Sequence, residues 1–138
     1  MVHIVTKVAE YAIITNDENE FRMVQWGSGF NYTWHFPGGR LEEGDREIEG
    51  LKREVREELV VELTGIKPAY AKYIQKDDKW INHPRYALFY LARIKEGSKI
   101  KLDESEHKSY KWYKKEDMEK IDFWLPFYKE MLKKILPF

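Results

Sequence analysis

The sequence contains no cysteine, carries no net charge and has no long apolar run. Without cysteine, disulfide scaffolds, thiolate metal sites and cysteine nucleophiles are excluded, and a reducing cytoplasm is the location we expect. The 24 basic residues balance the 24 acidic ones, which argues against binding a nucleic acid polymer through bulk charge. No segment approaches the roughly 18 apolar residues of a membrane span, and the charged N-terminal stretch is unlike a signal peptide, so we expect no membrane association.

The chain does have the composition of a folded protein. It has 138 residues, of which 43% are hydrophobic and 35% charged. That hydrophobic share is enough for one buried core, and the length suits one domain better than two. We therefore expect a single domain over residues 1–138.

Local patterns predict an alternation of strands and helices. Runs rich in β-branched and aromatic residues predict strands at 2–14, 21–26, 66–76, 85–94 and 109–113. The polar run 16–20 predicts a hairpin between the first two strands, and the glycine-rich stretch 27–44 predicts a loop. Apolar residues three and four apart predict helices at 45–59, with Asp45 as N-cap, and at 125–136, with a short helical turn at 115–120. This order predicts a mixed sheet with helices on its faces.

The first predicted helix lies in an acidic segment. Residues 39–62 contain nine acidic and five basic side chains, a net charge of 5 − 9 = −4. Glu54, Glu57 and Glu58 point to one face of the helix, and the like charges four apart repel by roughly 0.2–0.5 kcal/mol. A divalent cation would neutralise them, because hard cations prefer oxygen ligands. The alternative is a solvated helix with ion pairs such as that of Arg53 with Glu57.

The glycine loop before this helix adds further candidates. Gly38 and Gly39 allow close approach of the backbone, and a backbone carbonyl there could be a neutral metal ligand. Arg40 could bind a phosphate through its planar guanidinium. Tyr32 and Trp34 precede the loop and could stack on a base, although packing in the core is the alternative for each.

These residues resemble the box of the Nudix hydrolase family, G-x5-E-x7-R-E-U-x-E-E-x-G-U, where U is a bulky aliphatic residue. Seven of the nine fixed positions agree, and they are Gly39, Arg53, Glu54, Val55, Glu57, Glu58 and Val61. Asp45 stands in place of the first Glu and keeps its charge. Val60 stands in place of the Gly, whose left-handed conformation a β-branched residue disfavours. The chain at Val60 is therefore either strained or follows a different route.

The resemblance extends beyond the box, to a later segment, 106–112, that is similar to the E-H-x-x-Y-x-W segment of many members. It implies the Nudix fold, an α/β/α sandwich around a mixed sheet, and hydrolysis of a nucleoside diphosphate linked to another group. It also implies Mg²⁺, or alternatively Mn²⁺, bound by three box carboxylates and the Gly39 carbonyl. Those carboxylates belong to Glu54, Glu57 and Glu58.

The same resemblance implies roles for the other site residues. Arg53 would orient the acids, together with Asp45. The general base would be either a box glutamate or a glutamate on a later loop. Glu106 is the first loop candidate, and Glu104 is the second.

The leaving group is not readable from the sequence. The expected partner is a small nucleotide, either a nucleoside triphosphate or a nucleotide sugar. We expect no binding of a nucleic acid polymer, and the sequence leaves open whether the protein forms a homodimer. The Gly-Gly-Arg form differs from the Pro-Lys-Gly-His form common in diadenosine polyphosphate hydrolases, which disfavours that substrate class. The sequence also leaves open a non-catalytic nucleotide-binding module and an interaction domain with an acidic surface helix.

Overall fold

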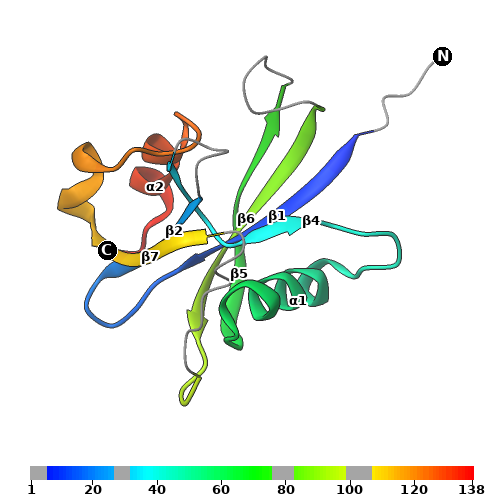
Figure 1. The fold of residues 1–138 in the computed structure, drawn as a ribbon, viewed down its shortest axis with the longest axis horizontal. Helices are drawn as coiled ribbons and strands as arrows, with labels where there is room; N and C mark the ends of the chain where they lie inside the picture. Colours follow the sequence, from blue (N-terminus) through cyan, green and yellow to red (C-terminus); the bar gives the residue numbers. More distant parts are fainter. Residues whose placement is uncertain (1–5, 27–31, 76–82, 99–106) are drawn as a thin grey trace.

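The structure is a computed structural model that describes residues 6–26, 32–75, 83–98 and 107–138. Within these residues the chain forms strands, two α-helices and a 3₁₀ helix (Figure 1). In chain order they are β1 (Lys7–Ile14), β2 (Glu20–Trp26), β3 (Trp34–His35), β4 (Gly38–Arg40), α1 (Glu47–Leu59), β5 (Leu63–Ile74), β6 (Arg85–Ile94), β7 (His107–Lys114), η2 (Lys115–Lys120) and α2 (Tyr128–Ile135). In these parts of the chain, no helix has the length and apolar character needed to cross a bilayer.

The strands form two sheets. The larger has the order β4-β1-β6-β5, and the smaller has the order β3-β2-β7. In the larger sheet β1 and β6 run parallel, whereas β4 and β5 are antiparallel to their neighbours, so this sheet is mixed as predicted. The short strand β4 is an edge strand, and it carries the Gly-Gly-Arg sequence.

Helix α1 covers one face of the larger sheet. Leu51, Val55 and Leu59, each four residues apart, are fully buried and form its apolar stripe. They pack with Ala12 and Ile14, which alternate along β1 and so share one face. Glu54 and Glu58 lie beside this stripe, and Glu58 is buried with it.

Helix α2 covers the other face (Figure 1). Tyr128, Met131 and Leu132 are buried in a second core cluster with Tyr11 and Phe89 from the centre of the sheet. The phenyl ring of Phe89 lies 5.9 Å from the Tyr128 ring in an edge-to-face contact. The two cores give the α/β/α layering that was expected.

Several local predictions were wrong in detail. β1 and β2 do not pair along their length as a hairpin, because they belong to different sheets; beside the turn they are joined by a bridge between Thr15 and Phe21 and by a backbone hydrogen bond from Asn16 to Glu20. The N-cap of α1 is Arg46 rather than Asp45, and it makes no side-chain capping bond. The predicted loop 27–44 contains β3 and β4, which were too short to detect from their pattern.

Candidate functional site

Arg53 holds four carboxylates of the acidic segment together. Its guanidinium lies 2.8 Å from Asp45 Oδ2, 3.3 Å from Glu54 Oε1, and 3.6 Å from both Glu42 Oε1 and Glu57 Oε1. Asp45 Oδ2 also accepts the backbone N–H of Glu42 at 2.8 Å, and this bond, with help from Arg53, holds the pKa of Asp45 below its usual range. Aspartate at this box position therefore keeps the contact with the arginine.

Glu54 lies directly against the backbone of β4. A Cβ atom on residue 39 would be 2.8 Å from Glu54 Oε2, so any other residue there would displace the carboxylate from its present position. Burial raises the pKa of Glu54, Arg53 offsets part of that rise, and the Glu57 carboxylate adds to it. The site therefore disfavours a further negative charge and would be stabilised by a cation.

Glu58 lies one turn further along α1 and contacts the other glycine of β4. Its Oε2 accepts the backbone N–H of Gly38 at 3.2 Å, and the residue is buried. Gly38 has φ +145°, and a Cβ there would lie 2.0 Å from the carbonyl oxygen of Glu10, so glycine is required. Glu57 differs, because its side chain is 60% exposed and faces Arg53.

The donor set fits a hard divalent cation by type. Glu54 and Glu58 present carboxylates to β4, next to the backbone of Gly39, and Glu57 follows on the same helix. As they stand, no three or more His, Cys, Asp or Glu side chains of the described residues are gathered closely enough to hold a metal ion. Glu54 and Glu57 contact the Arg53 guanidinium, whereas Glu58 accepts a hydrogen bond from the Gly38 backbone. Metal binding would therefore require these side chains to exchange partners.

The exit of α1 at Val60 is strained rather than rerouted. Val60 adopts the left-handed conformation, with φ 55° and ψ 42°, and its N–H donates to the Arg56 carbonyl at 2.9 Å. This is the conformation that suits the glycine of the box pattern, taken up by a β-branched residue. The helix end that carries Glu57 and Glu58 is thereby preserved.

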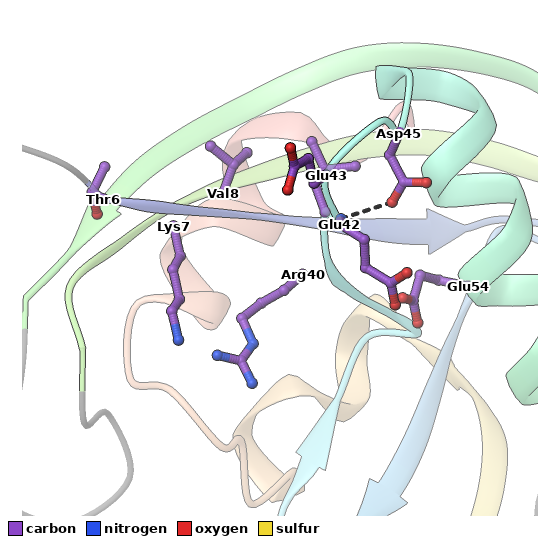
Figure 2. Close-up of a pocket in the computed structure, with 9 residues that line it drawn as sticks. Thr6, Lys7, Val8, Arg40, Glu42, Glu43, Asp45 and Glu54 are labelled. Carbon is purple, nitrogen blue, oxygen red and sulfur yellow. Dashed lines mark hydrogen bonds between the residues drawn. The ribbon is translucent and has the colours of Figure 1, made fainter.

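A cavity of about 740 Å³ adjoins the acidic segment. Figure 2 shows Lys7 and Arg40 projecting side by side, with Glu42 and Glu54 across the cavity. The lining residues are Thr6, Lys7, Val8, Arg40, Leu41, Glu42, Glu43, Asp45 and Glu54. Arg40, predicted as a phosphate-binding residue, therefore lies beside the carboxylates.

Not all predicted site residues meet in this place. Trp34 is half-buried, and its ring packs edge-on against Tyr113 at 5.2 Å, which is the packing alternative. Tyr32 is 45% exposed, and neither Tyr32 nor Trp34 is among the described residues that line the cavity. The loop candidates Glu104 and Glu106 lie outside the described residues.

The sequence prediction missed a buried carboxylate, Glu10, which pairs with Gly39 across β1 and β4. Glu10 is 1% exposed, and neither of its side-chain oxygens has a hydrogen-bond partner among the described residues. Burial raises the pKa of Glu10 to about 7. The nearby Tyr90 hydroxyl offsets part of this rise in pKa, although the hydrogen bond that this hydroxyl donates goes to Glu47. Alternation along β1 places residue 10 on the same face as buried Ala12, and that signal could have identified it.

Comparison with known proteins agrees with this geometry. A family model described as "NUDIX domain" matches residues 5–135. The chain belongs to the Nudix family. Its fold is similar to the crystal structure of the MutT NUDIX hydrolase from Burkholderia pseudomallei, with a TM-score of 0.75 and 18% identity over 95% of this chain and 98% of that one. The expected family and the expected Nudix fold are both confirmed.

Two curated Nudix relatives share 29% identity with this chain. One is the asymmetrical bis(5'-nucleosyl)-tetraphosphatase of Mus musculus, matched over 103 residues and 70% of this chain. The other is the RNA pyrophosphohydrolase of Helicobacter pylori strain G27, matched over 114 residues and 76% of this chain. The matched segments span 65% of the length of each relative.

Proposed function

We propose that this Nudix chain is a Mg²⁺-dependent pyrophosphohydrolase that cleaves a diphosphate linkage in a small nucleotide. The observation that carries the proposal is the placement of Glu54 and Glu58 against the two glycines of β4, with Arg53 holding the neighbouring acids. The two relatives support it, since one is named a tetraphosphatase and the other a pyrophosphohydrolase.

The chemistry required is attack of water on phosphorus, with rupture of one phosphoanhydride bond. A bound divalent cation would neutralise the phosphate charge and lower the pKa of the attacking water. Glu54, Glu57, Glu58 and the Gly39 carbonyl would hold it, with Mn²⁺ as an alternative to Mg²⁺. Arg40 would bind a phosphate oxygen through charge-assisted hydrogen bonds.

The proton and the electron pair both need acceptors. The water proton passes to a carboxylate, either a box glutamate or a glutamate of the later loop, where Glu106 is the first candidate and Glu104 the second. The electron pair of the broken bond stays on the oxygen of the departing phosphate. Arg53 does not touch the substrate in this scheme; it positions the acids.

The main competing function is a module that binds a nucleotide without cleaving it. The two departures from the box were the reason to consider it. Asp45 nevertheless contacts Arg53 at 2.8 Å, and Val60 keeps the left-handed helix exit. Both substitutions therefore preserve the local arrangement, which supports the hydrolase over the binding module.

A Mg²⁺-dependent screen with identification of the products by chromatography tests the proposal. The substrates are ATP, ADP-glucose, diadenosine tetraphosphate and a 5'-triphosphate RNA, each with and without EDTA. We expect hydrolysis of at least one small nucleotide in Mg²⁺ and none in EDTA. Binding by calorimetry without any turnover would favour the non-catalytic module, and turnover of the RNA alone would contradict the expectation of a small nucleotide.

A further inference from the structure

Three cationic side chains lie next to one another on adjacent strands of the larger sheet. Arg40 of β4 pairs with Ala9 of β1, and Lys7 of β1 pairs with Arg85 of β6. Paired residues on neighbouring strands share a face of the sheet, and so do residues two apart on one strand, such as Lys7 and Ala9. The side chains of Arg40, Lys7 and Arg85 therefore lie on one face. Ala9 belongs to the core cluster that contains α2, so this is the face opposite α1. We name Arg40, Lys7 and Arg85 the cationic row.

The cationic row takes part in no ion pair in the described parts of the chain. None of the ion pairs found there includes any of its three members. Arg85 Nε is buried without a hydrogen-bond partner among the described residues, although the Arg85 side chain also lies beside the buried Tyr11 hydroxyl. Like charges on neighbouring strands are unfavourable unless an anion joins them. The row therefore has the character of a site for a negatively charged ligand.

Two members of the cationic row, Lys7 and Arg40, adjoin the carboxylate site, whereas Arg85 is not among the described residues that line the cavity. Arg40 directly follows Gly39 in β4, and Lys7 and Arg40 line the same cavity as Glu42 and Glu54 (Figure 2). In Figure 2 the two cationic side chains are directed alike, away from the glutamates. A ligand with one end at the carboxylates can therefore continue towards Lys7, and it must be anionic along that length to be stabilised there.

We propose that the cationic row binds substrate phosphates beyond the cleaved diphosphate, so that the substrate is a small nucleotide with three or more consecutive phosphates. This inference rests on the proposed function and narrows it. A nucleotide sugar has only two phosphates followed by a neutral sugar, and it would leave Lys7 and Arg40 without an anion. A nucleoside triphosphate or a dinucleoside tetraphosphate supplies further phosphates, which match the ammonium of Lys7 and the guanidinium groups.

The first test compares Lys7→Gln with the wild-type protein on ATP, diadenosine tetraphosphate and ADP-glucose at one ionic strength. Lys7 is exposed at the start of β1, so its replacement leaves the core intact. We expect kcat/KM for the two longer phosphate chains to fall about tenfold more than kcat/KM for ADP-glucose, and Lys7→Arg to restore most of the loss. Lys67→Gln is the matched control, since Lys67 is exposed on β5 and pairs with Leu91, far along β6 from Arg85.

A second test is independent of metal and of turnover. Calorimetry in EDTA compares inorganic tripolyphosphate with pyrophosphate on the wild-type protein and both variants. We expect tripolyphosphate to bind the wild-type protein more tightly than pyrophosphate, and Lys7→Gln alone to remove most of that difference. If the protein hydrolyses nucleotides but Lys7→Gln behaves like Lys67→Gln in both tests, the row does not bind phosphate and the proposed function still stands. If no nucleotide is hydrolysed, the proposed function fails, and the EDTA titration alone decides whether the row binds phosphate.

Discussion

Val60 is a β-branched residue held in the left-handed region at the end of α1, with φ 55° and half of its surface exposed. A non-glycine residue there costs about 1–2 kcal/mol. Val60→Gly removes that cost but adds conformational freedom to the unfolded chain. We expect the free energy of unfolding to rise by about 1 kcal/mol, measured by denaturant titration without metal.

Val60→Ala is the control for this prediction, because alanine removes most of the side chain and keeps the strained conformation. It should give a much smaller gain than glycine. Equal gains from the two variants would show that the valine side chain, rather than the backbone, is unfavourable.

Glu10 gives the protein a pH-dependent stability. Burial raises its pKa from 4.5 to about 7 in the folded state. Between these values the folded protein holds a proton that the unfolded chain has lost, so stability falls as pH rises through this range and then levels off. Glu10→Gln removes the ionisation, and we expect it to stabilise the protein by about 2–3 kcal/mol at about pH 8 and very little at about pH 4.

Denaturant unfolding at the two pH values in EDTA measures this difference. Glu49→Gln, on the exposed surface of α1, serves as the control and should show no comparable change between the two pH values. A gain for Glu10→Gln that is the same at both pH values would mean that Glu10 does not titrate in this range.

At the residue scale, a spaced motif offers candidate side chains, whereas a residue that depends on packing is missed. Glu54, Glu57 and Glu58 stay predictions as metal ligands, and they were proposed because the box fixes their spacing along one helix. Glu10 lies outside any motif, and its importance comes from its position opposite Gly39 on another strand. Alternation along β1 can indicate that Glu10 is buried, but its pairing with Gly39 is not encoded in any short window of sequence.

At the scale of elements, the pattern located most strands but not all of their partners. The turn at 16–20 exists, since Asn16 Oδ1 accepts the backbone N–H groups of Glu18 and Glu20 at 3.1 and 3.0 Å. The strands on either side then separate, because β1 pairs with β4 and β6 while β2 pairs with β3 and β7. Turn chemistry is local and predictable, whereas the choice of a partner strand depends on contacts far along the chain.

Helix α2 contains a buried polar group that its packing does not satisfy. Tyr128 is fully buried, and its hydroxyl has no hydrogen-bond partner among the described residues. An unpaired buried hydroxyl costs about 1–3 kcal/mol. We expect Tyr128→Phe to raise the melting temperature, and the free energy of unfolding by about 1 kcal/mol.

Tyr90→Phe is the matched comparison in β6. Tyr90 is equally buried, but its hydroxyl donates to Glu47 Oε1. This variant should lower the free energy of unfolding by about 1 kcal/mol. If both tyrosine variants changed stability in the same direction, hydrogen bonding would not be the cause.

At the scale of the whole molecule, the order of strands and helices was enough to predict a mixed sheet between helices. The box then indicated which helix we expect to carry the site. The cationic row was not predicted, because it requires the register of three strands that are distant in sequence, with Arg40, Lys7 and Arg85 brought to one face. The cavity beside Glu54 depends on the same register.

If carboxylates of α1 support Mg²⁺-dependent cleavage of a phosphoanhydride, turnover must depend on both the metal and those side chains. The most direct measurement is turnover of the best nucleotide against Mg²⁺ concentration for the wild-type protein, Glu57→Gln and the control Glu49→Gln. The Glu57 side chain is 60% exposed, so its replacement should not disturb folding. We predict no turnover in EDTA, at least about a tenfold loss for Glu57→Gln, equivalent to about 1.4 kcal/mol in the barrier, and unchanged turnover for Glu49→Gln. Full activity of Glu57→Gln at limiting Mg²⁺, or undiminished wild-type turnover in EDTA, would contradict this role for the helix.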